Sequence, residues 1–277
     1  MIPPLNLVGA GHVGRTLGRL FATRGVFDVQ DVVTRSAASA RDAVAFIGAG
    51  RALSDAAAAR PAVVWMLAVT DDAIAPVAAH LARTAPLADA VVFHCSGAKA
   101  SSELDVLRRT GAHVASVHPV RSFADPATVA AAFDGTFCGI EGDEAALATL
   151  LPAFEAIGAR PVRIDAAAKT VYHAAAVFAS NYLVTVMDAA LRAYQAAGIP
   201  ADVARELARP LATETLANVL RLGPEAALTG PIARGDAATV ARQHDAVAGW
   251  DGPTGALYDA LATATWDLAR RKRAHVK

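Results

Sequence analysis

The segment LNLVGAGHVG, residues 5–14, decides the fold. A short apolar run with β-strand character leads into a Gly-x-Gly-x-x-Gly pattern, and a helical pattern follows from residue 12. Here Gly9 permits a tight turn, Gly11 lets a pyrophosphate approach the backbone, and Gly14 lets the helix pack close to the strand. The alternative is a glycine turn that serves only packing. The context favours dinucleotide binding by the loop, through Gly9, Ala10, Gly11, His12, Val13 and Gly14.

Strand-like and helical patterns alternate through the first part of the chain. Such alternation indicates βαβ units and a mostly parallel sheet, and continuous apolar strands indicate that helices cover both faces. The predicted strands are 5–8, 29–34, 63–69, 90–94, 114–118, 136–140 and 161–164. The predicted helices between them are 12–24, 71–83, 101–109 and 143–157.

The β-strand signal stops after Asp165, and only helical patterns follow. One long helix is predicted over 166–197, ended by Gly198-Ile199-Pro200, and further helices over 202–222, 236–247 and 254–273. The sequence therefore predicts an α/β Rossmann domain, residues 1–165, with a mostly parallel, doubly wound sheet. An all-α domain, residues 166–277, follows it.

The composition excludes several classes of protein. The 277 residues carry 26 basic and 26 acidic side chains, 54% are hydrophobic, and 69 are alanine. A disordered chain shows the opposite balance, and zero net charge gives no field that attracts nucleic acid or an anionic membrane. No run reaches the ~18 apolar residues of a membrane span, and no signal-peptide pattern precedes the first strand. Cys95 and Cys138 are expected to be buried thiols, so we expect a cytoplasmic protein, and we predict no metal site.

The residues at the end of the second strand indicate whether the dinucleotide is NADPH or NADH. A site for NADH places Asp or Glu there, on the ribose 2′-hydroxyl. This chain instead has Thr34, Arg35 and Ser36. A guanidinium binds a 2′-phosphate through charge-assisted hydrogen bonds, which predicts NADP(H) over NADH. The alternative is that Arg35 is a solvated loop residue.

Polar side chains also follow the next three predicted strands. Val69 and Thr70 end the third strand and would lie along the nicotinamide half of the cofactor, as would Ser96, which follows His94 at the end of the fourth. His118 ends the fifth strand. Two histidines at neighbouring strand ends suggest a site in the crevice, although a single one is more often structural. No local signature supports Cys95 as a nucleophile.

The helix predicted over 166–197 carries an unusual polar strip. Lys169, His173 and Ser180 fall within about 40° of one another around a helix, with Asn181 at the edge. The chain has only four lysines but 22 arginines, so Lys169, a lysine among alanines, is a candidate for facing the cleft. It can protonate a carbonyl oxygen or bind a carboxylate. The alternative is a surface lysine beside a core histidine.

With these residues in view, the chain resembles the broad group with an NADP-binding Rossmann domain followed by a helical domain. That group includes 6-phosphogluconate and 3-hydroxyisobutyrate dehydrogenases, pyrroline-5-carboxylate reductase, ketopantoate reductase and prephenate dehydrogenase. Within it, the chain is most similar to a bacterial Rossmann-like family with a C-terminal helical domain of unknown function. The resemblance rests on the segments 8–14, 94–97, 118–123, 169–182 and 229–236.

The resemblance implies roles for particular residues. Lys169 matches a catalytic lysine of the hydroxyacid dehydrogenases and ketopantoate reductase, but His173 replaces the asparagine that follows it there. His118-Pro119 resembles a His-Pro pair of prephenate dehydrogenases. Some members of the bacterial family act as ketopantoate reductases, which favours a 2-oxo acid substrate. Helical domains of this group commonly form intertwined dimers, which implies a homodimer through residues 166–277.

The leading hypothesis is an NADPH-dependent reductase of a small carbonyl compound, such as the 2-oxo acid ketopantoate. Lys169 is predicted to donate the proton or to polarise the carbonyl group, and the residues predicted to orient the substrate are His173, Asn181, Ser96 and His118. The alternatives are a hydroxy-acid or prephenate-type dehydrogenase, a deazaflavin-linked NADP oxidoreductase and, in another class, a non-catalytic NADPH sensor.

Overall fold

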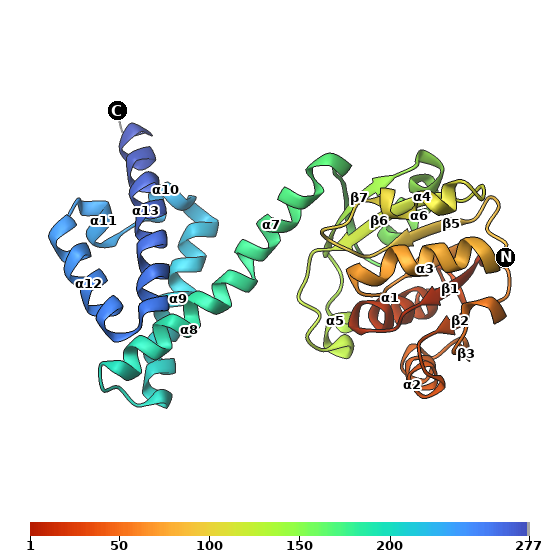
Figure 1. Ribbon diagram of the computed structural model, residues 1–277, viewed down its shortest axis with the longest axis horizontal. Coiled ribbons are helices and arrows are strands. Elements are labelled where there is room, and N and C mark those ends of the chain that lie inside the picture. The colour runs from red at the N-terminus through yellow and green to blue at the C-terminus, as the bar shows by residue number, and fades with distance from the viewer. Residues whose placement is uncertain (276–277) are drawn as a thin grey trace. The chain divides into compact units, whose positions relative to one another are not determined.

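The computed structural model describes residues 1–275, which divide into two packing units (Figure 1). The first unit is Met1–Ser180, and the second begins at Asn181. The change from alternating to purely helical structure occurs close to residue 165, after β8 (Arg160–Arg163). The packing boundary lies further along the chain because α7 (Lys169–Ala179) packs with the sheet.

One sheet in the order β3-β2-β1-β4-β5-β6-β7-β8 organises the first unit. Every neighbouring pair is parallel except β6 and β7, which confirms the predicted mostly parallel sheet. The carboxyl ends of β1, β4, β5 and β6 therefore share one edge, which is where ligands of such sheets bind. The other strand bounds are Pro4–Val8 (β1), Asp28–Val33 (β2), Arg51–Leu53 (β3), Val64–Leu67 (β4), Val91–His94 (β5), His113–Pro119 (β6) and Phe137–Gly142 (β7).

Helices cover both faces of this sheet (Figure 1). On one face Leu7 packs in a core with Phe21 and Phe154, whose rings meet edge to face at 5.4 Å. On the other face Trp65 packs with Ile74 and Leu81. Burial on both faces explains the continuous apolar strands. The helices are α1 (His12–Thr23), α2 (Ala37–Ile47), α3 (Asp71–Thr84), α4 (Asp105–Arg108), α5 (Pro126–Ala131) and α6 (Glu144–Ala156), with 3₁₀ turns at Ala56–Ala58, Ser101–Leu104 and Ala166–Ala168.

In the first unit, one strand and two α-helices lie outside the predicted ones: β3, α2 and α5. β3 has three residues and α5 has six, too few to establish a period. In α2 two of the three buried residues are alanines, Ala40 and Ala43. Alanine occurs on both faces of helices in this chain, so it gives little contrast between buried and exposed positions.

The second unit consists of helices within its described residues. Asp236 caps α12, because its side chain accepts a hydrogen bond from the Thr239 amide at 3.0 Å. The segment 229–236, between two predicted helices, contains a short helix, α11. The bounds are α8 (Asn181–Ala196), α9 (Ala201–Leu222), α10 (Pro224–Ala227), α11 (Gly230–Arg234), α12 (Ala237–Trp250) and α13 (Gly252–His275).

The single helix predicted over 166–197 is wrong. Ser180 leaves helical geometry, with φ −129° and ψ −72°, and separates α7 from α8. The segment Ala166–Ala196 is long and apolar enough, by length and composition alone, to cross a membrane. Its first part nevertheless packs within the sheet unit through Lys169, which is 1% exposed.

Candidate active site at the carboxyl edge of the sheet

The glycine loop follows β1 with the geometry that its pattern predicts. Gly9 has φ +86°, and a Cβ there would lie 2.5 Å from the Ala68 carbonyl oxygen. A Cβ on Gly14 would lie 2.6 Å from the Gly9 oxygen, so α1 packs directly against the loop. Gly11 instead faces open space, with no atom of the described residues within 4 Å of such a Cβ.

The start of α1 is suited to an anion. Gly11 is the N-cap residue and offers no side chain, and the first turn holds no acidic residue. The first N–H groups of the helix, at His12 and Val13, therefore keep their donor capacity and positive dipole end. The His12 ring contacts the Phe123 carbonyl oxygen at 2.5 Å, which ties this turn to the segment after β6.

The end of β2 carries hydroxyls and a cation. Thr34 donates to the Ser36 carbonyl oxygen at 2.8 Å, and Ser36 caps α2 by accepting from the Ser39 amide at 3.2 Å. Arg35 is exposed, and its guanidinium has no partner within residues 1–275. The carboxylate of Asp31, earlier in β2, is fully buried under Arg51 and Arg60.

The ends of β4 and β5 frame the next part of the crevice. Val69 packs on the glycine loop, 2.6 Å from a Cβ built on Gly9, and Thr70 is the N-cap residue of α3. Ser96 is 7% exposed, and its hydroxyl accepts from the Ala98 and Lys99 amides at 3.2 and 2.9 Å. That hydroxyl closes a turn at the edge where the cofactor is predicted.

His94 is a structural residue. It is fully buried, its Nε2 donates to the Ala100 carbonyl oxygen at 3.0 Å, and its Nδ1 accepts from the Ser96 amide at 3.2 Å. Burial lowers the pKa of His94 to about 4, so the ring is neutral and holds the turn at 95–100. Burial also raises the pKa of the neighbouring Cys95 thiol to about 12, which disfavours a thiolate nucleophile.

Lys169 does not face open solvent. It is 1% exposed, and its ammonium donates to the Ser116 hydroxyl and pairs with Glu141, Nζ to Oε1 at 3.5 Å. Glu141 is 5% exposed and accepts from the amide and hydroxyl of Ser101 at 2.8 and 2.7 Å. Burial lowers the pKa of Lys169, and Glu141 opposes that effect. The proton-donor role of Lys169 stays a prediction, and its position favours an anchor for α7.

The next turn of α7 brings two further side chains to the ends of β5 and β6. The Tyr172 hydroxyl lies 3.1 Å from His118 Nδ1, and the rings of His118 and His173 lie 5.6 Å apart. A Cβ on Gly97 would lie 2.3 Å from His173 Nδ1 and 2.8 Å from His118 Nε2, so both nitrogens converge over that glycine. His173 Nδ1 is buried without a hydrogen-bond partner in the described chain.

The predicted polar strip is thus only partly assembled. Lys169 and His173 lie on α7, where His173 meets His118 of β6, whereas Ser180 ends α7 and Asn181 begins the second unit. Tyr172 and Glu141 were missed by sequence reasoning. Glu141 is a lone carboxylate in the apolar strand FCGIEG, a signal that a buried partner was needed. Burial, reinforced by His173, lowers the pKa of His118 to about 4, so the His118 ring is neutral at pH 7.

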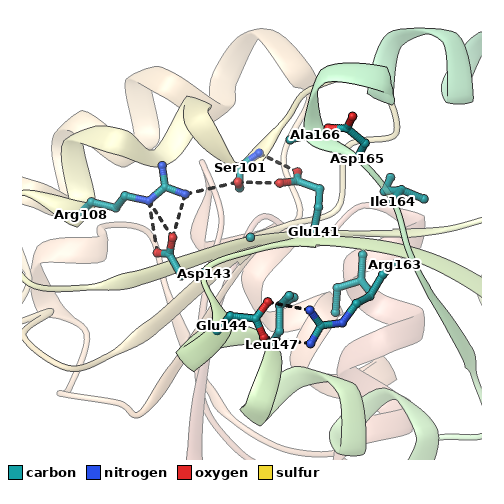
Figure 2. Close-up of a pocket in the computed structure, with 12 residues that line it drawn as sticks. Ser101, Arg108, Glu141, Asp143, Glu144, Leu147, Arg163, Ile164, Asp165 and Ala166 are labelled. Atoms are coloured by element: carbon teal, nitrogen blue, oxygen red, sulfur yellow. Dashed lines mark hydrogen bonds and ion pairs between the residues drawn. The ribbon is translucent and has the colours of Figure 1, made fainter.

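A separate pocket of about 360 Å³ lies at the ends of β7 and β8 (Figure 2). Its charged side chains pair with one another: Arg108 with Asp143 at 3.1 Å, and Arg163 with Glu144 at 2.6 Å. Of the other charged residues that line it, Glu141 pairs with Lys169, and Asp165 accepts a hydrogen bond from the Ala167 amide at 2.9 Å. Among residues 1–275, no group of three or more His, Cys, Asp or Glu side chains is placed to hold a metal ion.

Two family models match the chain. A Rossmann-like domain matches residues 4–119, and a domain of unknown function, DUF2520, matches residues 136–265. The chain pairs a Rossmann-like domain with a DUF2520 domain. The DUF2520 match begins within the sheet, at β7, and therefore includes Glu141, Lys169, Tyr172 and His173.

Solved structures share this two-part architecture. Protein TM1727 from Thermotoga maritima is 29% identical, with a TM-score of 0.76 over 97% of this chain and 99% of that one. A protein from Bacteroides fragilis named as a candidate NADP oxidoreductase, BF3122, is 23% identical, with a TM-score of 0.78 over 96% and 98%. A pyrroline-5-carboxylate reductase from Coxiella burnetii is 14% identical, with a TM-score of 0.59 over 98% and 99%. No curated protein matches the chain.

Proposed function

We propose that this Rossmann-like and DUF2520 protein is an NADP(H)-dependent oxidoreductase. The observation that carries the proposal is the glycine loop: Gly11 is open to solvent at an uncapped helix start, and Gly9 and Gly14 have no room for a side chain. Such a loop holds a pyrophosphate on backbone N–H groups. The names of similar structures, an NADP oxidoreductase and a reductive aminase in complex with NADPH, support the same cofactor.

NADPH over NADH rests on the end of β2. Arg35 is exposed and unpaired within the described chain, beside the hydroxyls of Thr34 and Ser36, and Asp31 is occupied by two arginines. Titration of both cofactors into the wild type and Arg35→Ala tests this. We expect the variant to bind NADPH about 10- to 100-fold more weakly, a loss of 1.4–2.8 kcal/mol. NADH affinity should change less than twofold, and an unchanged affinity ratio would remove Arg35 from the site.

The proposed reaction is hydride transfer to a small carbonyl compound. Bound NADPH would supply the hydride, and the cluster of the neutral His118 with Tyr172 and His173 would supply hydrogen bonds and a proton. The test of this reaction is NADPH oxidation against a panel of candidate substrates. A 2-oxo acid such as ketopantoate is the first of them, on the resemblance alone. Lys169 is held by Glu141, so a substrate carboxylate needs another cation.

An imine belongs in the same panel, because an imine reductase from Myxococcus stipitatus shares the architecture. That protein is 19% identical, with a TM-score of 0.62 over 99% of this chain and 95% of that one. The assay in the reverse direction is oxidation of hydroxy acids or of a prephenate-type substrate. A further assay is hydride exchange with a deazaflavin. NADPH oxidation with any substrate of the panel would support the proposal that the protein is an enzyme. NADPH binding without turnover on all of them would favour a sensor.

The proposed assembly is a homodimer through the helical unit, in the cytoplasm, with no membrane or nucleic-acid partner. Large apolar side chains of α8 and α9 are exposed, including Val184 at 69%, Leu211 at 62% and Leu220 at 79%. Apolar surface of this kind marks an interface with protein or lipid. Sedimentation at micromolar concentration should give twice the 28.4 kDa mass, and a monomer would refute the dimer.

A further inference from the structure

The geometry points to Arg15 of α1 as a second cation for the 2′-phosphate of NADPH, acting together with Arg35. This inference rests on the proposed function for its ligand. It adds a residue that belongs neither to the glycine pattern nor to the end of β2. The chemical group that Arg15 recognises is a phosphomonoester on the adenosine ribose.

The side chain of Arg15 folds back over the glycine loop. Its Nε donates to the Ala10 carbonyl oxygen at 3.0 Å. Helical side chains point towards the N-terminus of their helix, so this direction is the ordinary one for the first turns of α1. The hydrogen bond to Ala10 uses one of the five N–H donors of the guanidinium. Arg15 is half-buried, and its two Nη groups have no hydrogen-bond or ion-pair partner within residues 1–275.

Arg15 lies on the side of α1 that faces α2. Arg19 follows one turn later, and its Nη1 donates to the carbonyl oxygen of Phe46 in α2 at 3.2 Å. Its guanidinium also lies 5.1 Å from the centre of the Phe46 ring. Residues four apart share one face of a helix, so Arg15 is on this face one turn closer to the glycine loop. Because β1 and β2 are parallel, α1 and α2 both begin at the carboxyl edge of the sheet.

The glycine loop is joined to the end of β2 by a hydrogen bond. The Gly9 amide donates to the Val33 carbonyl oxygen at 2.8 Å, and Val8 lies opposite Val33 in the parallel register. Arg35 comes two residues after Val33. The loop that Arg15 covers is therefore bonded to the strand end that carries Arg35. The two arginines reach this join from different elements, one from α1 and the other from β2.

No nearby carboxylate of the described chain occupies these cations. The only acidic residues before residue 42 are Asp28 and Asp31. Asp28 begins β2, at the opposite edge of the sheet, and the Asp31 carboxylate is buried under Arg51 and Arg60. A phosphomonoester carries close to two negative charges at pH 7 and offers three acceptor oxygens, which suits two guanidinium groups. The 2′-hydroxyl of NADH leaves both groups without an anion.

The test compares ligands that differ only in the 2′-phosphate. NADPH, NADH, adenosine 2′,5′-bisphosphate and adenosine 5′-monophosphate are titrated calorimetrically into the wild type and Arg15→Ala. We expect the variant to bind NADPH and the bisphosphate about tenfold more weakly, because one charge-assisted contact is lost. Its affinities for NADH and the monophosphate should stay within about twofold of the wild type, because these ligands lack the phosphate that Arg15 contacts.

Two further variants isolate the charge of Arg15 from its contact with the loop. Arg15→Gln removes the charge but keeps an amide donor for the Ala10 carbonyl oxygen, and it should show the same selective loss. Arg19→Ala is the matched control, because it removes an arginine from the same helix face whose guanidinium is held by Phe46. All four affinities of this control should stay within about twofold of the wild type.

The outcomes separate the inference from the proposed function. Equal losses for NADPH and NADH in both Arg15 variants would place Arg15 at the pyrophosphate and overturn the inference. Unchanged affinities in both variants would also overturn it, while NADPH binding by the wild type would leave the proposed function in place. A wild type that binds neither dinucleotide, but prefers the bisphosphate through Arg15, would sink the proposed function and keep the phosphomonoester site.

Discussion

Lys169 of α7 and Glu141 of β7 form an ion pair that is almost completely withdrawn from solvent, with Nζ and Oε1 3.5 Å apart and side chains 1% and 5% exposed. A buried pair is strongly destabilised when one partner alone is removed. We expect Glu141→Gln to lower the free energy of unfolding by about 3–5 kcal/mol, measured by urea denaturation. The double variant Glu141→Gln/Lys169→Met should recover much of the loss, because no uncompensated charge remains. Equal losses in the single and double variants would contradict this role.

Acid should destabilise the first unit through its neutral histidines. The pKa values of His94 and His118 are lowered to about 4 from the usual 6.5, so between these values the unfolded chain binds protons that the folded chain does not. Stability is therefore lost as the pH falls from about 6.5 to 4, by up to about 3 kcal/mol per histidine. Unfolding of the wild type and His94→Gln across this range checks it, and identical slopes would exclude His94 as a contributor.

Two glycines of the dinucleotide loop should respond differently to alanine. Gly11→Ala fits the fold, because Gly11 has φ −69° and open space around a Cβ, but the methyl group faces the predicted pyrophosphate. Its melting temperature should stay within about 2 °C of the wild type while NADPH affinity falls about tenfold or more. Gly14→Ala should lower the melting temperature, because the Gly9 oxygen is 2.6 Å away. Thermal scans with and without NADPH measure both effects.

Gly97 should be needed for turnover rather than for cofactor binding. A Cβ there would occupy the point on which His118 and His173 converge, 2.8 and 2.3 Å from their nitrogens. We expect Gly97→Ala to reduce kcat/KM about 100-fold, a loss of about 2.7 kcal/mol, with NADPH affinity nearly unchanged. Gly249→Ala, which meets open space in the second unit, is the matched control. A fully active Gly97→Ala would exclude a substrate group at this point.

Much of the first unit could be predicted because its signals are local. The glycine loop, the alternation of strands and helices, and the hydroxyls after β2 depend on neighbouring residues, and each is found where the sequence places it. The break at Ser180 could not be predicted, because AVFASNYLV continues the helical composition without Gly or Pro.

The site was harder to predict because its members meet only through the fold. Lys169 and His173 were predicted from their spacing on one helix. The residues that they contact, Glu141 and Gly97, lie on other elements. Tyr172 was passed over because a tyrosine in an Ala-rich helix usually serves packing. Its hydroxyl meets His118 only because the fold brings α7 to the end of β6.

The anchoring of α7 on the sheet has a consequence for how such chains can be recombined. A crossover at residue 165, where the last strand has ended, would separate Glu141 from Lys169 and leave the sheet half with a buried, unmatched carboxylate. A crossover at Ser180 keeps Lys169, Tyr172 and His173 with the strands they contact. Chimaeras that exchange helical halves among relatives should therefore fold when joined after α7 and fail when joined before it.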